Sequence, residues 1–316
     1  MGMNTLVVGG GVIGLTAAIR LREAGIDADV VAREPPETTA SAVAAALWYP
    51  YRAFPVERVA AWAARGFDVL AGLSAAEGTG VRMRWGTELV LDAAEEPWWR
   101  PAVRSIERTA EGYRVEVPVA DMSVHLPWLV HRLHALGGSL EVGAVDSLDE
   151  ALRRAPVVVN AAGLGARELA GDRLLLPVRG QVVYVECPGV KEWLLDQSDP
   201  ERPLYVVPRE RDVVLGGTAE EGVEGAEPDP LTATAILERC AAVVPALRHA
   251  RVTGRAAGVR PARASVRLEA EERAGGTVVH CYGHGGAGVT LAWGCADEVV
   301  ALVRRALAAD VGRMAS

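Results

Sequence analysis

Two glycine clusters near opposite ends of this 316-residue chain have the spacing of a phosphate-binding turn. Gly9, Gly11 and Gly14 follow the G-x-G-x-x-G pattern. In that pattern the first glycine allows a tight turn, the second admits a pyrophosphate and the third lets the helix pack on its strand. The second cluster, Gly283–Gly288, also precedes an apolar stretch with helical spacing. Because helix N-termini attract anions, the two clusters together predict one long flavin dinucleotide held between them. Alone, either cluster could be a chance glycine turn.

Arg33 and Glu34 stand where the second strand should end, the usual place of a ribose-binding carboxylate. Glu34 could bind a ribose hydroxyl. Arg33 occupies the position where an acid is more common, which leaves open a 2′-phosphate and therefore NADP.

A second group of residues could bind a substrate carboxylate. Arg260 lies at the end of the strand-like segment Gly258–Pro261. A guanidinium binds a carboxylate through a bidentate pair of hydrogen bonds. Tyr205, at the start of another strand-like segment, could donate a phenolic hydrogen bond to the same group. The simpler alternatives are a surface ion pair for Arg260 and core packing for Tyr205.

The histidines and the lysine give weaker evidence for a catalytic or metal-binding role. His280 and His284 flank the second glycine cluster, and local hydrogen bonding is favoured over catalysis for both. His131 and His134 are expected on a helix surface, because no acidic partner completes a metal site. Lys191 is the only lysine and falls in a predicted turn, which disfavours Schiff-base chemistry.

Composition narrows the class of protein. The net charge of −8 disfavours nucleic acid as a partner, and no apolar run reaches the roughly 20 residues of a membrane span. Four cysteines, Cys187, Cys240, Cys281 and Cys295, form no CxxC pair. Free buried thiols in a prokaryotic cytoplasm are expected, although the sequence leaves a Cys240–Cys295 pair open. The N-terminal apolar stretch is interpreted as a buried strand and helix rather than a signal peptide.

Periodicity places these residues on an α/β fold. Thr5–Val8 and Asp29–Ala32 are predicted strands that enclose a helix ending near Gly25. This is the opening of a doubly wound parallel sheet. The pattern stops after residue 50 and resumes near 125, with a helix through Leu129 and the strand Pro156–Val159.

The intervening segments alternate as antiparallel strands do. The predicted elements are the strands Arg82–Asp92, Gly112–Val117, Pro177–Glu186 and Tyr205–Gly216 and the helix Leu231–Val244. We therefore expect a Rossmann-like, doubly wound FAD-binding domain of residues 1–50, 125–175 and 253–316. An antiparallel-sheet substrate domain of residues 51–124 and 176–252 would be interleaved with it.

The chain resembles the D-amino acid oxidase family of flavoproteins over essentially its whole length. The family's C-terminal signature is matched by Val278–Gly288 followed by Gly294–Ala296. Cys281 departs from the Asn, His or Ala usual at its position. Val43–Tyr51 is similar to the family's flavin-contacting loop, with Ala46 where glycine is frequent. Pro177–Gln181 and Gly258–Pro261 are also similar.

The resemblance implies FAD with its pyrophosphate over the first glycine cluster and its ring near Ala45–Leu47 and Gly285–Thr290. Thr38, Thr39 and Ser41 would hold phosphate or ribitol, and the adenosine would lie near Val145 and Gly163. The residues expected to bind FAD are Gly9, Gly11, Val12, Ile13, Gly14, Arg33, Glu34, Thr38, Thr39, Ser41, Ala45, Ala46, Leu47, Val145, Gly163, Gly285, Gly286, Gly288, Val289 and Thr290.

The resemblance also implies the reaction. Arg260 and Tyr205 would clamp the substrate carboxylate, and the Gly286 carbonyl would accept from the amine. Only the α-hydrogen of a D-amino acid would then face flavin N5 for hydride transfer. The products would be a 2-oxo acid, ammonia and hydrogen peroxide, after reoxidation by oxygen. The loop before Tyr205 lacks a second, lid tyrosine, and the family suggests a homodimer.

Several alternatives remain open from sequence. A D-aspartate oxidase would need one more cation, for which Arg52, Arg202 and Arg209 are candidates. None stands at the expected lid position, so neutral or broad D-amino acids are favoured. A glycine or sarcosine oxidase and a quinone-reducing dehydrogenase are less favoured. A non-catalytic flavin-binding redox sensor would need neither Arg260 nor Tyr205.

Overall fold

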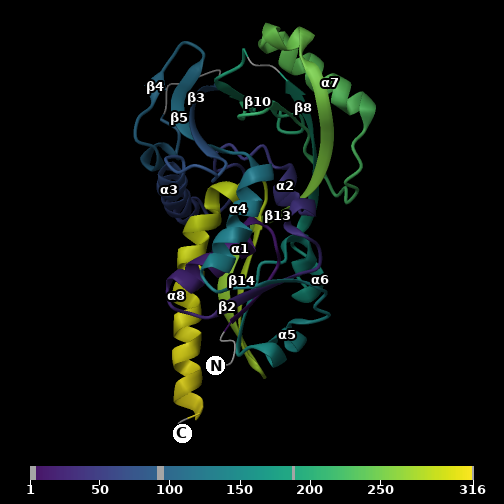
Figure 1. Cartoon of the computed structure of the whole chain (residues 1–316). Coiled ribbons are helices and arrows are strands. Elements are labelled where there is room, and N and C mark those ends of the chain that lie inside the picture. Colours follow the sequence, from purple (N-terminus) through teal and green to yellow (C-terminus); the bar gives the residue numbers. More distant parts are fainter. Residues whose placement is uncertain (1–4, 91–95, 187–188, 315–316) are drawn as a thin grey trace.

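The computed structural model describes residues 5–90, 96–186 and 189–314, and its strands form one continuous sheet (Figure 1). The strand order is β4-β5-β3-β9-β10-β11-β8-β13-β14-β7-β1-β2-β6, with β12 paired to β8 beside this path. One end of the sheet is parallel and the other is mainly antiparallel. The two ends occupy opposite halves of the molecule in Figure 1.

The parallel end is the doubly wound sheet expected from the sequence. Its strands are β1 (Thr5–Val8), β2 (Ala28–Ala32), β6 (Leu140–Val142), β7 (Val157–Asn160) and β14 (Gly276–His284). Every residue of β1 and β7 is buried, as in a parallel strand covered on both faces. Helices α1 (Val12–Glu23), α4 (Met122–Ala135) and α8 (Gly288–Met314) pack on one face, and α5 (Leu148–Arg154) packs on the other.

The other end carries the elements inserted between these strands. They are β3 (Val81–Leu89), β4 (Glu107–Arg108), β5 (Gly112–Ala120), β8 (Leu176–Glu186), β9 (Trp193–Asp196), β10 (Leu204–Pro208), β11 (Val213–Gly216), β12 (Glu220–Glu221), α3 (Val56–Leu73) and α7 (Pro230–Val243). This end of the sheet is antiparallel as expected, except that β3 runs parallel to β9, a strand that was not predicted. These two strands come from different insertions, so no hairpin fixes their relative direction.

A single long strand, β13 (Arg251–Arg273), joins the two ends of the sheet. Its first half pairs with β8 and its second half with β14, and the register shifts between Ala262 and Arg267. The sequence prediction that this strand ends at Arg260 is wrong. A bulge lets the chain pass Pro261 and change partner without leaving the sheet. Arg260 therefore lies mid-strand, where the two halves of the molecule meet.

Two glycines bring α3 and α8 into backbone contact. A Cβ at Gly66 would lie 2.0 Å from the carbonyl oxygen of Thr290, and one at Gly294 would lie 2.4 Å from the Cα of Trp62. Neither position can carry a side chain without moving a helix. This contact fixes the first turns of α8, and it explains the glycine in the Gly294–Ala296 part of the signature.

The remaining elements are short. They are η1 (Pro36–Thr38), α2 (Ala40–Val43), η2 (Arg100–Ala102), η3 (Gly163–Gly165), α6 (Ala166–Leu169) and η4 (Pro245–His249). The predicted strand Arg82–Asp92 is β3, and residues 91–95 lie outside the described part of the chain. His131 and His134 are exposed on α4, as expected. Within the described residues, no helix has the length and apolar character of a membrane span.

Candidate active site

The first glycine turn is as tight as its spacing predicts. It connects β1 to α1, and Gly9 has a φ of 124°, in the region that favours glycine. A Cβ on Gly9 would lie 2.3 Å from the carbonyl oxygen of Ala161, and one on Gly14 would lie 1.9 Å from the carbonyl oxygen of Gly9. The turn is therefore lined by backbone, which can approach a phosphate closely.

The N-terminus of α8 lies beside the N-terminus of α1. A Cβ on Gly288, the first residue of α8, would be 4.0 Å from Cγ1 of Val12, the first residue of α1. Two helix N-termini, each with partial positive charge, thus meet at one place. The two glycine clusters, 270 residues apart in the sequence, converge as expected.

Three hydroxyl residues predicted to hold phosphate or ribitol follow β2. Ser41 Oγ accepts a 3.0 Å hydrogen bond from the backbone N–H of Val12. A Cβ on Gly11 would lie 3.1 Å from the same Oγ and 4.0 Å from Oγ1 of Thr39. Thr38 and Thr39 each donate to a backbone carbonyl three residues earlier. Ser41 and Thr39 therefore lie at the phosphate end of α1.

The candidates for the adenosine side are spread over the ends of the parallel strands. Arg33 and Glu34 follow β2, are exposed and pair with each other at 3.7 Å. The carbonyl oxygen of Glu34 lies 3.6 Å from the Cβ position of Gly10. Val145 packs against the core under β1, and Gly163, with a φ of 58°, follows β7. All four lie at or near the carboxyl edge of the sheet, where such folds bind ligands.

The predicted flavin loop is tied to the first turn of α8. Thr290 Oγ1 accepts from the backbone N–H of Tyr49 and donates to its carbonyl oxygen, both at 3.0 Å. Leu47 forms a β-bridge to Val119, and Ala46 is buried with a φ of 54°. That left-handed conformation is the physical reason why glycine is suited to the position. Ala45–Leu47 and Gly285–Thr290 are thus held together.

A cavity of about 180 Å³ opens beside this loop. It is lined by Tyr51, Arg52, Leu176, Val178, Glu221, Arg260, Ala262, Arg263, Ala264, Gly285 and Gly286. The structure therefore brings Arg260 and Gly286 into one cavity, as predicted. A larger hollow of about 690 Å³, between residues 54–58 and 263–269, contains none of the predicted site residues.

Tyr51 lines this cavity and was not among the residues predicted to form the site. Its hydroxyl is buried and has no hydrogen-bond partner in the described part of the chain. A Cβ on Gly286 would lie 2.5 Å from Cδ1 of Tyr51, so the ring covers that glycine. Tyr51 is the last residue of the loop that resembles a flavin-contacting segment, and that position is the sequence feature that could have identified it. A buried, unpartnered phenol is suited to bind a polar ligand.

Arg260 is a cation that has no carboxylate counterion among the described residues. Its Nη1 donates to the carbonyl oxygen of Thr218 at 3.0 Å, and its guanidinium lies against Gly180. None of the carboxylates in the described part of the chain pairs with it, so the predicted alternative of a surface ion pair is wrong. A partly buried guanidinium in a cavity favours an anion such as a carboxylate.

Tyr205 lies next to Arg260 but is not in the cavity lining. Its ring covers Gly216 and Gly217, where a side chain would overlap the phenol. Burial raises the pKa of the Tyr205 phenol, and the charge and hydrogen bond of Arg260 partly oppose that rise. The phenol therefore remains protonated at neutral pH, and its O–H is able to donate a hydrogen bond to a ligand.

The histidine and cysteine expectations are mostly met. His280 is buried and contacts Glu271 through Nε2 at 2.9 Å and Asn160 through Nδ1 at 3.4 Å, so it is structural. Cys240 and Cys295 belong to different hydrophobic clusters and are free, so the pair left open by the sequence does not form. Cys187 lies outside the described residues.

The three candidate cations for a second carboxylate differ in position. Arg52 lines the cavity and pairs only loosely with Glu221, at 3.7 Å. Arg202 is exposed and pairs with Asp199 at 2.8 Å, and Arg209 is engaged by Asp212 at 2.7 Å. Of the three, Arg52 alone borders the cavity of Arg260.

Comparisons with known proteins agree with this geometry. The model of the FAD dependent oxidoreductase family, DAO, matches residues 4–302. A protein of Rubrobacter xylanophilus named D-amino-acid oxidase is 55% identical over 315 residues, which covers 96% of this chain and 97% of that protein. Another of the same name, from Streptomyces coelicolor, is 50% identical and covers 95% of this chain and 96% of that protein.

Glycine oxidase from Geobacillus kaustophilus shares the fold, with a TM-score of 0.79 at 19% identity over 96% of this chain and 94% of that structure. The glycine-lined turn at the start of α1 fits the dinucleotide that the family name specifies, because backbone at Gly9 and Gly14 lines it and leaves room for close approach of a phosphate. The chain therefore belongs to the FAD dependent oxidoreductase family, with FAD as its cofactor.

Proposed function

We propose that this protein oxidises neutral D-amino acids, or a broad range of them, with FAD, giving a 2-oxo acid, ammonia and hydrogen peroxide. The observation that carries the proposal is Arg260, a cavity-lining guanidinium with no carboxylate partner among the described residues. The names of the two bacterial relatives support the same activity.

The chain's own groups account for binding and stereochemistry. Arg260 and the Tyr205 phenol hold the substrate carboxylate, and the Gly286 carbonyl accepts from the amine. Three fixed contacts orient the α-carbon, so that one enantiomer presents its hydrogen correctly. Bound FAD supplies the acceptor for that hydrogen as hydride. The N-terminus of α8 at Gly288 stabilises negative charge that develops beside it.

We propose the following residues as the FAD site. Gly9, Gly11, Val12, Ile13 and Gly14 would hold the pyrophosphate, with Thr38, Thr39 and Ser41 beside it. Ala45–Leu47, with Gly285, Gly286, Gly288, Val289 and Thr290, would contact the ring. Arg33, Glu34, Val145 and Gly163 would lie on the adenosine side. The close approach of Ser41 and Thr39 to Gly11 supports the phosphate assignment.

The domain division stays a proposal. The parallel strands fall within residues 1–50, 125–175 and 253–316, and the inserted strands fall within 51–124 and 176–252. This favours a cofactor domain and a substrate domain, with β13 shared between them. A homodimer and a cytoplasmic location are further proposals. The free described cysteines favour a reducing compartment. Sedimentation and cell fractionation would test the two.

The decisive experiment measures hydrogen peroxide release from the purified yellow protein with D-alanine, D-aspartate or L-alanine. We expect release with D-alanine and none with L-alanine. The variant Arg260→Ala should lose activity by orders of magnitude while its flavin spectrum persists. A flavin spectrum without turnover of any substrate would refute the oxidase and favour a redox sensor, which should be indifferent to Arg260→Ala.

D-aspartate oxidation is the second candidate, and Arg52 is the observation that favours it. Its guanidinium borders the cavity, and its ion pair with Glu221 is long enough to be exchanged for a substrate carboxylate. A strong preference for D-aspartate over D-alanine in the same assay would replace the first candidate with this one.

A further inference from the structure

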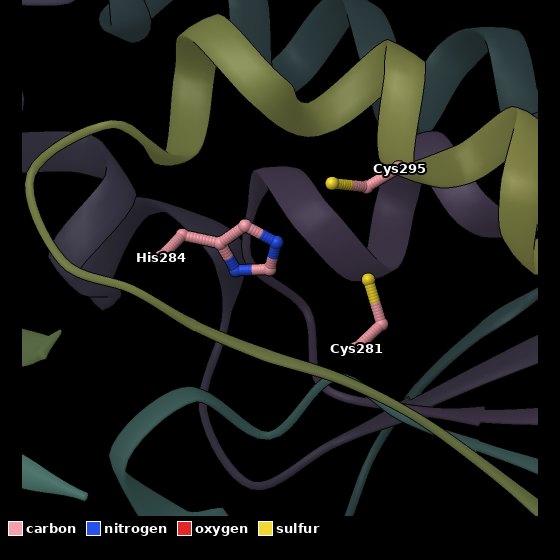
Figure 2. Close-up of side chains that lie close together, drawn as sticks. All are labelled: Cys281, His284 and Cys295. Carbon is pink, nitrogen blue, oxygen red and sulfur yellow. The ribbon is translucent and has the colours of Figure 1, made fainter. Parts of the chain in front are cut away.

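Behind the second glycine cluster, three buried side chains of the described residues come together (Figure 2). Cys281 and His284 lie near the end of β14, and Cys295 lies in the second turn of α8. Their exposed fractions are 1%, 2% and 0%, and their sulfur and nitrogen atoms lie within 4.8 Å of one another. The two thiols therefore come from the two elements that flank the Gly283–Gly288 turn.

His284 has an atom that needs a partner. Its Nε2 is buried and has no hydrogen bond to any described residue, and in Figure 2 the ring points toward the two sulfur atoms. The neighbouring Cys295 and His284 lower the pKa of the Cys281 thiol, against the opposing effect of burial. Burial and the neighbouring Cys281 raise the pKa of Cys295. The group thus pairs one easily ionised thiol with one thiol that stays protonated, next to a base.

The Cys281–Cys295 pair lies close to the candidate substrate cavity. Gly285 and Gly286, which line the candidate substrate cavity, immediately follow His284. Cys281 is also the residue at which this chain departs from the family signature. The cysteine at this position supplies a second sulfur beside Cys295. It has no role in the proposed binding of FAD or substrate.

We propose that Cys281 and Cys295 form a reversible disulfide, driven by the hydrogen peroxide that the enzyme releases in the adjacent cavity. The source of the oxidant rests on the proposed function. His284 takes the proton of the Cys281 thiol, and the thiolate attacks one peroxide oxygen. The O–O bond breaks, and the leaving hydroxide takes the proton back as water, which leaves a sulfenic acid on Cys281.

Cys295 then attacks the sulfenic sulfur. The S–S bond forms, the S–O bond breaks, and the thiol proton leaves with the hydroxyl as a second water. Two thiols lose two electrons, which reduce one peroxide to two waters. The bridge would join β14 to α8 across the glycine turn. Oxidised protein should therefore unfold at a higher temperature than reduced protein.

A metal ion is the competing occupant. Thiolate and imidazole are zinc ligands, but a structural zinc site needs four, and the described residues supply three here. Bound zinc is therefore an outcome that the experiment must detect.

The test uses the reduced holoenzyme in two arms, with D-alanine turnover in one and added hydrogen peroxide without substrate in the other. Free thiols are alkylated under denaturing conditions, and peptides are mapped by mass. We expect loss of about 2 Da and a linked Cys281–Cys295 peptide in both arms, reversed by dithiothreitol. Cys281→Ala, which carries a residue usual in the family, should form no bridge, and Cys240→Ser should form it normally.

The outcomes separate the two proposals. If added peroxide leaves both thiols free, the disulfide is refuted whatever the activity. If turnover releases peroxide without forming the bridge, the proposed driving oxidant is refuted. If no peroxide is released but added peroxide forms the bridge, the proposed oxidase activity and the source of the oxidant fail, and the disulfide stands. Stoichiometric zinc in the purified protein, protecting both thiols from peroxide, would replace the disulfide with a metal site.

Discussion

Gly180 offers a way to move the Arg260 guanidinium, the proposed substrate clamp, without removing its charge. This residue lies in β8 against the guanidinium of Arg260, and a Cβ there would lie 2.2 Å from Nη2. Ordinary van der Waals contact begins at 3.4 Å, so the guanidinium would have to move by about 1.2 Å, the difference between these distances. Gly180→Ala therefore tests the position of the clamp.

The expected effect is large on activity and small on stability. A displacement of about 1 Å in a positioning group can cost roughly 100-fold in rate. The moving atoms are the far end of a flexible side chain, and the main stability loss is the Arg260 bond to Thr218, about 1 kcal/mol. We expect kcat/KM for D-alanine to fall by about 100-fold, with FAD content and melting temperature nearly unchanged.

The assay is peroxide release at several D-alanine concentrations, with flavin absorbance and a thermal melt on the same sample. Gly189→Ala is the matched control, because a Cβ there meets nothing within 4 Å. Unchanged kinetics in a flavin-loaded Gly180→Ala protein would show that the Arg260 guanidinium does not clamp the substrate at its observed place.

Three further substitutions test other parts of the molecule. Gly14→Ala places a Cβ 1.9 Å from the carbonyl oxygen of Gly9, so the turn must open and the purified protein should be colourless. Retention of stoichiometric FAD would contradict a pyrophosphate site there. Burial raises the pKa of the Glu88 carboxyl above its usual 4.5. Its stability contribution is therefore complete below pH 4.5 and is lost as pH rises through the folded-state pKa. Glu88→Gln should remove this loss, so that the melting temperature depends less on pH above pH 4.5. An unchanged pH dependence would contradict the raised pKa of Glu88. Arg52→Ala should lower kcat/KM for D-aspartate relative to D-alanine by about five-fold, as expected for roughly 1 kcal/mol from a part-exposed cation. An equal loss for both substrates would remove Arg52 as a specificity residue.

Local patterns predicted the cofactor half of the protein well. The spacing of Gly9, Gly11 and Gly14 specifies a turn whose constraints lie within a few residues, and the structure has that turn. The parallel strands and their helices were predicted for the same reason, because hydrophobic periodicity is a local signal. The sequence predicts that strand β13 ends at Arg260, which is too early. Pro261 reads as a strand end locally, and only pairing with β8 and β14 carries the strand past it.

The sequence by itself determined which residues could do chemistry: the glycine turns, Arg260 as a candidate for binding a carboxylate, and the unusual Cys281. Only the tertiary structure decided which of them meet. It left Arg260 without a carboxylate partner among the described residues, and it put Arg52 rather than Arg202 or Arg209 at the cavity. It also brought Cys281 to Cys295. The physical reason is that each of these contacts joins strands or helices that pack together only in the folded chain, so residue spacing does not encode it.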